Sequence, residues 1–329
     1  MPRRSKRDIN GVLLLNKPLG ITSNDAMIRI RGIFHAQKAG HTGALDPLAT
    51  GMLPICLGEA TKYSQYLLDA DKSYDVTARF GIRTTTSDAE GEIIKESEVN
   101  LDKLSLMSAM EHFLGKQKQV PSMYSALKYE GRPLYEYARK GIEVPREARD
   151  ITIFSFTLID FDGRDAKMQV HCSKGTYIRS LIDDLGEYIG CGAHVFKLDR
   201  TQVADYPKEK MVTFEDIERI SEEAHQRGEV AFDSLDKLLL PVDTAVQKLP
   251  IIYLSKEEGK LILQGRELKV RPVNMLTTDL QPIRIYINLS DDRSVFAGVG
   301  DIKYDRLYPK RLITMTKMPQ ELFSDEMVS

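Results

Sequence analysis

Regular alternation of apolar and polar side chains is the feature that most limits the folds open to this chain. In residues 74–80, Tyr74, Val76, Ala78 and Phe80 alternate with polar residues, as expected of a strand with one buried face. Further strand patterns cover residues 11–16, 151–160, 167–172 and 194–203. Helical patterns cover residues 23–34, 59–68, 101–114 and 177–188, and the pair Ser23-Asn24 is expected to cap the first of these helices. Strands interleaved with helices, without an internal repeat, predict a mixed α and β fold and exclude a solenoid.

A change in composition divides the chain. Its 329 residues suffice for about two domains. Residues 213–245 carry nine acidic side chains against three basic ones, and short strand-like runs with glycines follow to residue 316. This pattern predicts a large domain at 1–247, a small β-rich module at 248–317 and a tail at 318–329.

Cysteine usage and hydropathy exclude several classes of protein. Cys56, Cys172 and Cys191 cannot all pair, and none lies in a CxxC motif, so neither a disulfide framework nor a zinc site is indicated. The apolar run Val12–Leu15 is too short for a signal peptide or a membrane span. We therefore expect a cytoplasmic protein without a membrane segment.

A glycine-rich stretch, AGHTGALDPLATG at residues 39–51, holds the first candidate for chemistry. We expect a long loop here that continues to about Gly58. Asp followed by Pro is a common turn opener, but long loops inside compact domains tend to be functional. The apolar neighbours of Asp46 would partly desolvate its carboxylate, which would then need a cationic partner to stay ionised. An ionised, poorly hydrated carboxylate is a nucleophile or a base.

A second stretch, HCSKGTYIRSLI at residues 171–182, supplies a possible partner. Thr176 is positioned to cap the helix that follows, with Tyr177 and Arg179 in its first turn. Arg179 is either a surface cation with a buried stem or the guanidinium that Asp46 requires, since arginine stays charged when buried and binds carboxylates bidentately.

Taken with the runs LNKPLGITSND at 15–25 and KSY at 72–74, these two stretches resemble the bacterial tRNA pseudouridine synthase B (TruB) family. The motifs occur in the family's order from Asn10 to about Pro207, and the similarity is looser beyond. The resemblance implies an α+β pseudouridine synthase fold, in which helices and loops flank a central, mainly antiparallel sheet. It also implies a C-terminal PUA-like RNA-binding domain.

The resemblance implies that Asp46 is the catalytic carboxylate and that Arg179 is its salt-bridge partner. The implied reaction converts uridine 55 of the tRNA T-loop to pseudouridine, without metal or cofactor, by detaching the base at N1 and rejoining it through C5. Three roles for Asp46 stay open: attack on the ribose C1′, addition to C6 of the base, or removal of a C2′ proton.

Further residues match the family's substrate site. Tyr74 corresponds to the tyrosine that stacks on the flipped base, and whether its phenol also helps remove the C5 proton stays open. His41 matches a histidine that holds the flipped nucleotides, and Tyr177 and Leu198 match positions that line the uridine site. Lys17, in a Lys-Pro motif, either supports the catalytic loop or contacts phosphate.

The run FGIRTTTSD at residues 80–88 departs from the family pattern. Thr85 stands where the family more often has Asp, while Asp88, the later acid of the motif, is present and is assigned to the substrate site. Residues 121–149, rich in tyrosines and basic side chains, correspond to an insertion that folds over the T-loop when RNA binds.

The implied partner is tRNA, bound through its T-arm by a monomer without an obligatory protein partner. Two other classes of protein are alternatives. One is a tRNA-binding or tRNA-folding factor in which Asp46 is only a turn residue, and the other is a guide-RNA-dependent synthase of the dyskerin type. The joint presence of Asp46, Tyr74 and Arg179 favours an enzyme over a binder. The short C-terminal segment disfavours the guide-dependent type.

Charge distribution reconciles this prediction with a net charge of only −2. Residues 1–212 carry a net charge of +2 and residues 246–317 carry +5, whereas residues 213–245 carry −6 and the tail carries −3. Four basic side chains also open the chain: Arg3, Arg4, Lys6 and Arg7. They form either a solvated start or an arm that contacts phosphate. Local basic regions predict salt-sensitive RNA binding that the total charge conceals.

Overall fold

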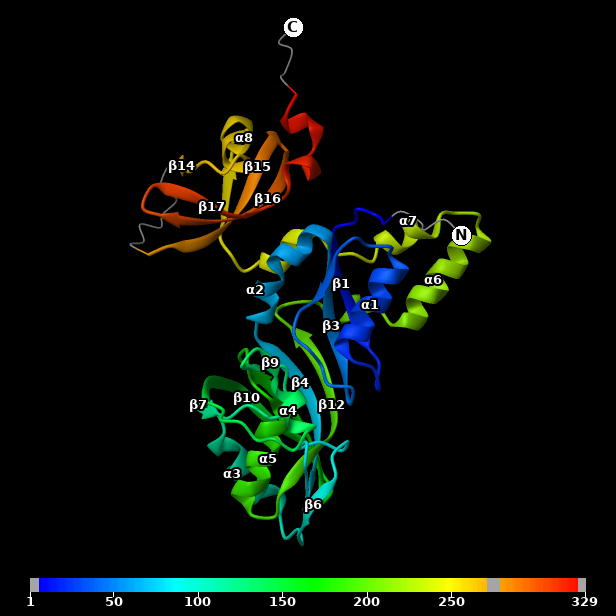
Figure 1. Ribbon diagram of the computed structural model, residues 1–329, viewed down its shortest axis with the longest axis vertical. Coiled ribbons are helices and arrows are strands. Elements are labelled where there is room, and N and C mark those ends of the chain that lie inside the picture. Colours follow the sequence, from blue (N-terminus) through cyan, green and yellow to red (C-terminus); the bar gives the residue numbers. More distant parts are fainter. Residues whose placement is uncertain (1–5, 271–278, 325–329) are drawn as a thin grey trace.

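A central β-sheet forms the larger part of the computed structural model, which describes residues 6–270 and 279–324 (Figure 1). Its strand order is β1-β3-β12-β4-β11-β10-β7, with β2 paired to β3, and only the β3–β12 pair is parallel. The strands are β1 (Gly11–Lys17), β2 (Ala39–His41), β3 (Ala49–Leu57), β4 (Lys72–Phe80), β7 (Gly115–Gln119), β10 (Arg149–Phe161), β11 (Asp165–Cys172) and β12 (Ala193–Val203). The predicted central, mainly antiparallel sheet is confirmed.

Alternation along the strands separates two hydrophobic cores. On β1, Leu13 and Leu15 face a core shared with α1 (Ser23–Ile33), α3 (Lys103–His112) and α5 (Ile178–Ile189), while Val12 and Leu14 face a second core. The second core is shared with η1 (Gly58–Tyr63), α2 (Ser64–Leu68) and η3 (Val242–Val246). Because these leucines are buried, truncating one to alanine would cost about 2–5 kcal/mol.

Smaller elements complete this part of the chain. They are β5 (Ile82–Thr84), β6 (Ile93–Glu96), β8 (Lys128–Tyr129), β9 (Arg132–Pro133), α4 (Leu134–Ala138), η2 (Lys208–Lys210), α6 (Phe214–Gln226) and α7 (Ala231–Asp236). The acidic segment 213–245 is largely helical, and a capping box formed by Thr213 and Asp216 begins α6.

The expectation of a long loop up to Gly58 is wrong, because Ala49–Leu57 is strand β3, between β1 and β12. Every β3 residue except Thr50 is buried, so the segment shows the continuous apolar run of a strand with both faces covered. The glycines of residues 39–51, among them Gly51, favour a loop when the sequence is considered alone. Gly51 has φ +99°, and a Cβ there would lie 2.4 Å from the backbone oxygen of Arg200, so this close strand pair requires glycine.

A five-stranded sheet in the order β13-β15-β16-β17-β14 forms the C-terminal module, with α8 packed on it. Its elements are β13 (Ile251–Leu254), α8 (Lys256–Leu263), β14 (Leu268–Lys269), β15 (Gln281–Ser290), β16 (Arg293–Lys303), β17 (Arg306–Leu312), η4 (Met315–Lys317) and η5 (Gln320–Leu322). Leu322 is buried in this module's core. The predicted small β-rich domain is confirmed, and its boundaries at 248 and 317 stay predictions.

Hydrogen bonds join the two parts of the molecule through η1. The Glu59 carboxylate accepts from the backbone N–H of Thr314 at 2.7 Å and from its hydroxyl at 3.0 Å. Lys62 Nζ donates to the Leu312 carbonyl at 2.9 Å, and the Tyr63 hydroxyl donates to the Arg311 carbonyl at 2.9 Å. Figure 1 shows the C-terminal sheet beyond the α2 end of the central sheet.

The chain start is partly anchored. Arg7 forms an ion pair with Asp236 and lies 4.2 Å from the centre of the Phe232 ring. Arg3 and Arg4 lie outside the described residues, so neither alternative for the basic start, a solvated segment or an arm that contacts phosphate, is tested there. All three cysteines are free and buried. Within residues 6–270 and 279–324, we find no helix with the length and apolar character that a membrane crossing requires.

Candidate active site

The turn between β2 and β3, residues 42–48, carries Asp46 and is held from two sides. The hydroxyl of Ser23 donates to the Leu45 carbonyl at 3.1 Å and accepts from the Leu45 N–H at 2.7 Å. Gly20 N–H donates to the Pro47 carbonyl at 2.8 Å. Ser23 was expected to help cap α1, but Thr22 is the cap. Ser23 is thereby free to bond the turn.

Arg179, in the first turn of α5, lies between two carboxylates. Its Nε is 2.9 Å from Asp46 Oδ2, and its Nη1 is 3.7 Å from Asp88 Oδ2. The Arg179 and Asp88 side chains are 6% and 3% exposed, whereas that of Asp46 is 40% exposed. The structure thus brings together the residues that the two separate motifs were expected to pair, and only the Asp46 end of the network is open to a ligand.

Backbone carbonyls complete the hydrogen bonding of Arg179. Its Nη1 donates to the Thr86 carbonyl at 3.1 Å, and its Nη2 donates to the Tyr124 carbonyl at 2.7 Å. Tyr124 belongs to the segment 121–149, so this segment contacts the same guanidinium as Asp46. A side chain with this many fixed partners is rigid, which holds Asp46 in one place.

The start of α5 is fixed by a residue that sequence reasoning missed. Gln119, at the end of β7, accepts from the N–H of Tyr177 at 2.8 Å and donates to its carbonyl at 3.0 Å. Tyr177 is the N-cap position of α5 and makes no side-chain cap. The Thr176 hydroxyl, predicted to cap the helix, donates instead to the Ser173 carbonyl at 3.0 Å.

Burial and nearby charged groups set the charge state of Asp46. Burial raises the pKa of this carboxyl above its ordinary value, Arg179 pulls the pKa down, and the nearby Asp88 carboxylate raises it again. Asp88 has other partners, since its Oδ1 accepts from the Thr86 hydroxyl at 2.5 Å and from Glu90 N–H at 3.1 Å. Without Arg179, two carboxyl groups would share this region with no paired cation, and ionising Asp46 would cost more.

Tyr74 lies on β4 and is 7% exposed. Leu198, on β12, pairs with Val76 across the β4–β12 ladder and therefore shares a sheet face with Tyr74. Burial raises the pKa of the Tyr74 phenol to about 12, against the opposing charge of Arg200. The phenol is therefore protonated at neutral pH, and both residues lie in the core cluster that borders the site.

His41 ends β2 next to the Asp46 turn. Its Nδ1 atom is buried and has no hydrogen-bond partner among the residues that the structure describes. Burial lowers the pKa of the imidazole, and the charge of Arg200 lowers it further, so the ring is neutral at pH 7. A buried polar atom without a partner is costly, which makes Nδ1 a position where a ligand group would be stabilising.

Lys17 is fully buried at the end of β1. Its Nζ donates to the carbonyls of Pro18 at 2.9 Å and of Ile21 at 2.8 Å. Burial lowers its pKa to about 8, partly offset by the Asp46 charge. Of the two roles considered for this lysine, the contacts favour support of the 18–21 turn, because its head group is directed at carbonyls rather than at solvent.

Two more cations near the site escaped the sequence reasoning. Arg200, 1% exposed, donates from Nε to the Met52 carbonyl at 2.8 Å and from Nη2 to the Gly43 carbonyl at 3.0 Å. Lys72 donates to carbonyls at the end of α2, with its shortest bond 2.7 Å to Ala70. Their positions in the sequence could have indicated both residues. Lys72 lies two residues from Tyr74 and Arg200 two residues from Leu198, and side chains two residues apart in a strand point to the same face of the sheet.

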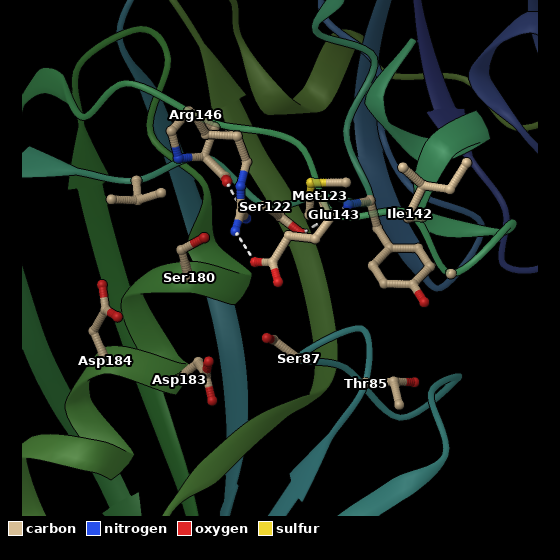
Figure 2. A pocket seen from close by; sticks show the side chains of 15 residues that line it. Thr85, Ser87, Ser122, Met123, Ile142, Glu143, Arg146, Ser180, Asp183 and Asp184 are labelled. Carbon is tan, nitrogen blue, oxygen red and sulfur yellow. Dashed lines mark hydrogen bonds and ion pairs between the residues drawn. The ribbon is translucent and has the colours of Figure 1, made fainter. Parts of the chain in front are cut away.

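A cavity of about 420 Å³ lies between the segment 121–149 and α5 (Figure 2). Arg146 and Glu143 form an ion pair on one side, and Ser180 and Asp183 of α5 lie on the other. Thr85, the departure from the family pattern, also lines the cavity, and its hydroxyl accepts from Glu92 N–H at 3.1 Å. A carboxylate could accept that bond too, so the substitution leaves the loop's hydrogen bonding intact.

Comparison with known protein families identifies the class to which the chain belongs. Residues 31–178 match the N-terminal domain of the TruB family of pseudouridylate synthases, residues 179–247 match a tRNA pseudouridylate synthase B C-terminal domain, and residues 250–313 match a pseudouridine synthase II TruB C-terminal domain. Fold and site together therefore define a pseudouridine synthase.

Curated relatives narrow the class to a family. A protein named tRNA pseudouridine synthase B from Aliivibrio fischeri (strain MJ11) is 53% identical over 94% of this chain and 96% of its own length. Proteins of the same name from Yersinia pestis (strain Pestoides F) and Vibrio campbellii (strain ATCC BAA-1116) are each 54% identical, over 95% and 94% of this chain and 94% and 97% of their own lengths. The chain belongs to the TruB family of pseudouridine synthases.

Solved structures with lower identity share the fold. A chain from an H/ACA RNP bound to a substrate RNA containing 2′-deoxyuridine aligns with TM-score 0.71 and 23% identity, over 95% of this chain and 86% of that one. A chain from the archaeal box H/ACA sRNP Nop10-Cbf5 complex aligns with TM-score 0.70 and 24% identity, over 96% and 88%. The predicted fold class is thereby confirmed.

Proposed function

We propose that this chain isomerises uridine 55 in the T-loop of tRNA to pseudouridine, with Asp46 as the catalytic carboxylate. The observation that carries the proposal is the ion pair between Arg179 and Asp46, in which the arginine is buried and the carboxylate is partly open. The relatives named above, which share more than half of their residues with this chain, support tRNA as the substrate.

The reaction imports no atoms and changes no oxidation state. The bond from ribose C1′ to N1 breaks, a bond from C1′ to C5 forms, C5 loses its hydrogen as a proton and N1 gains one. Asp46 attacks C1′, adds to C6 or removes a C2′ proton, and each of these roles needs an ionised carboxylate. Arg179 favours that ionised form, and carboxylate, fixed cation and desolvated surroundings together supply the electrostatics without a cofactor or metal.

Uridine 55 is inaccessible inside a folded T-loop, so the enzyme must flip it out at a cost of about a few kcal/mol. Tyr74 provides an aromatic face for the flipped base, with Leu198 and Tyr177 beside it. Because the Tyr74 phenol is protonated at neutral pH, stacking is the better-supported role, and accepting the C5 proton would first require the phenol to ionise. The unpaired Nδ1 of His41 offers a hydrogen bond to a flipped nucleotide.

RNA outside the active site would meet two basic surfaces. The segment 121–149 contacts Arg179 through Tyr124 and would fold over the T-loop, with tyrosines stacking on bases and basic side chains meeting phosphates. Residues 246–317, with a net charge of +5, would contact the phosphate backbone. The affinity for tRNA should therefore fall as the salt concentration rises.

Incubation of unmodified tRNA with wild type and with Asp46→Asn, followed by mapping of pseudouridine at single-nucleotide resolution, tests the proposal. Wild type should produce pseudouridine at position 55 alone, and Asp46→Asn should bind tRNA and produce none. A tRNA with cytidine 55 is the matched substrate control. Wild type that binds tRNA without forming pseudouridine would support a binding or folding factor instead.

We also propose that the chain works as a monomer in the cytoplasm, without an obligatory protein partner. The shared fold with H/ACA proteins does not by itself imply shared partners. Light scattering of the purified chain with tRNA should give the mass of one chain and one tRNA. Activity that appears only after addition of cell extract would contradict this part of the proposal.

A further inference from the structure

Arg200 is a buried charge whose surroundings differ from those of the other arginine in the site. Arg179 is near two carboxylates, whereas no carboxylate forms an ion pair with Arg200 in residues 6–270 and 279–324. Burying an unpaired cation is expensive, so a role beyond packing has to be sought in what Arg200 contacts.

Arg200 donates two hydrogen bonds to the segment that carries the catalytic turn. Gly43 lies three residues before Asp46, and Met52 lies on the strand that follows the turn. Gly43 has a φ of +88°, which favours glycine, and a Cβ at this position would be in ordinary van der Waals contact with Arg200 Nη1 at 3.5 Å. The head group of Arg200 is thus fixed relative to Asp46 by backbone atoms alone.

Another neighbour of Arg200 is the tyrosine assigned to the substrate base. Arg200 and Tyr74 are directly paired across the β12–β4 ladder, and the two side chains lie on the same sheet face. A charge and side-chain interaction between them favours the ionised phenol. One guanidinium therefore connects the turn of Asp46 with the aromatic ring.

We infer that Arg200 is a positioning residue: anchored on the Gly43 and Met52 carbonyls, it orients the Tyr74 ring through its hydroxyl so that the flipped base is held against Asp46. This inference rests on the proposed function. A base displaced by 1 Å is enough to cost about 100-fold in rate, so Arg200 would act on turnover more than on the affinity for tRNA, most of which comes from phosphate contacts.

A double-mutant cycle between Arg200→Met and Tyr74→Phe tests this coupling. Methionine removes the charge at similar length, and phenylalanine keeps the ring but removes the hydroxyl. Each single variant should lower the single-turnover rate on tRNA by about 100-fold, with the Kd for tRNA changed by less than about 2-fold. Because both changes break one interaction, the double variant should be no slower than the slower single variant, and Arg200→Lys should recover part of the rate.

Arg79→Met is the matched control, because Arg79 lies on the same strand as Tyr74, faces the other side of the sheet and pairs with Asp165. Arg79→Met should lower the single-turnover rate only slightly. In the double variant with Tyr74→Phe, the two fold losses in rate should multiply. The inference would be overturned if the fold losses in rate of Arg200→Met and Tyr74→Phe multiplied in the double variant. An unchanged rate for Arg200→Met alone would overturn it too. If Arg200→Met does not fold, the cycle with Arg200→Lys decides by the same criterion. Wild type that makes no pseudouridine refutes the proposed function itself.

Discussion

The two buried arginines of the site are held in opposite ways. Arg179 lies between Asp46 and Asp88, and these two carboxylates balance its positive charge. Arg200, close to Lys72 and Tyr74, is held by main-chain carbonyls and leaves positive charge uncompensated. The region around Arg179 is balanced in charge and holds the carboxylate of Asp46. The region around Arg200 has an excess of positive charge next to the Tyr74 ring.

The two arginines should therefore have different roles. We expect Arg179 to keep Asp46 ionised and Arg200 to hold Tyr74 in place. On the Arg179 side, removing the cation changes the protonation of Asp46, because burial and Asp88 both favour the neutral acid. On the Arg200 side, the phenol is protonated at neutral pH whether or not the cation is present, since burial raises its pKa to about 12. Variants on the two sides should therefore differ in their dependence on pH as well as in rate.

The largest effect is expected on the charge-matched side. Arg179→Ala should lower the turnover of tRNA by about 1,000-fold or more, because the buried network loses its cation and Asp46 its partner. The Kd for tRNA should stay within about 2-fold, measured by filter binding. Equal losses in rate and affinity would show that Arg179 contacts phosphate instead, and the two regions would no longer differ as described.

Tyr74 is the corresponding test of the positively charged side. Tyr74→Ala removes the ring and should lower the rate by more than Tyr74→Phe, which is expected to cost about 100-fold through loss of the hydroxyl contact. Stacking on a base contributes about 1–3 kcal/mol, so the alanine variant should also bind a T-loop RNA more weakly. A fully active alanine variant would remove Tyr74 from the site.

Asp88→Asn tests the second carboxylate of the network around Arg179. Asp88 raises the pKa of Asp46, so its removal should lower that pKa and move the acidic limb of the pH–rate profile to lower pH. At neutral pH the rate should fall by only about 10-fold, through looser placement of Arg179. A limb that moves to higher pH, or stays in place, would show that Asp88 does not act on Asp46 electrostatically.

The smallest effect is expected for Lys72→Met. Burial, with a smaller contribution from the charge of Arg200, lowers the pKa of Lys72 to about 8, so most of the lysine is still protonated at neutral pH. Its loss relieves repulsion on Arg200 and should change the rate by less than about 5-fold, while the melting temperature shifts by a few degrees. A loss as large as that of Arg200→Met would show that the whole cation cluster acts as a unit.

Much of the fold follows from local patterns in the sequence. Alternation predicts β4, β10, β11 and β12, and apolar periodicity predicts α1, α3 and α5. The pattern fails at β3, because a strand buried on both faces has no alternation and its Gly51 and Pro54 imitate a turn. The cap of α1 was misplaced by one residue, since Ser23 has a tertiary partner, Leu45, that no local rule shows.

The site divides in a similar way. Asp46 and Arg179 were found through motifs and through the need of a desolvated carboxylate for a cation, and the structure places them 2.9 Å apart. Arg200 and Gln119 were missed because their partners are backbone groups of distant segments. Contacts of that kind depend on strand register, and no single segment of sequence encodes it.

The central claim is that Arg179 keeps Asp46 ionised for the reaction, and the pH dependence of the single-turnover rate tests it most directly. Wild type should lose activity as the pH falls through the raised pKa of Asp46. Arg179→Lys, which keeps the charge, should be slower with an acidic midpoint close to that of wild type. Arg179→Met should move the midpoint to higher pH, because burial and Asp88 are then opposed only by the more weakly acting charge of Lys17. An unchanged midpoint in a folded Arg179→Met variant would contradict the account.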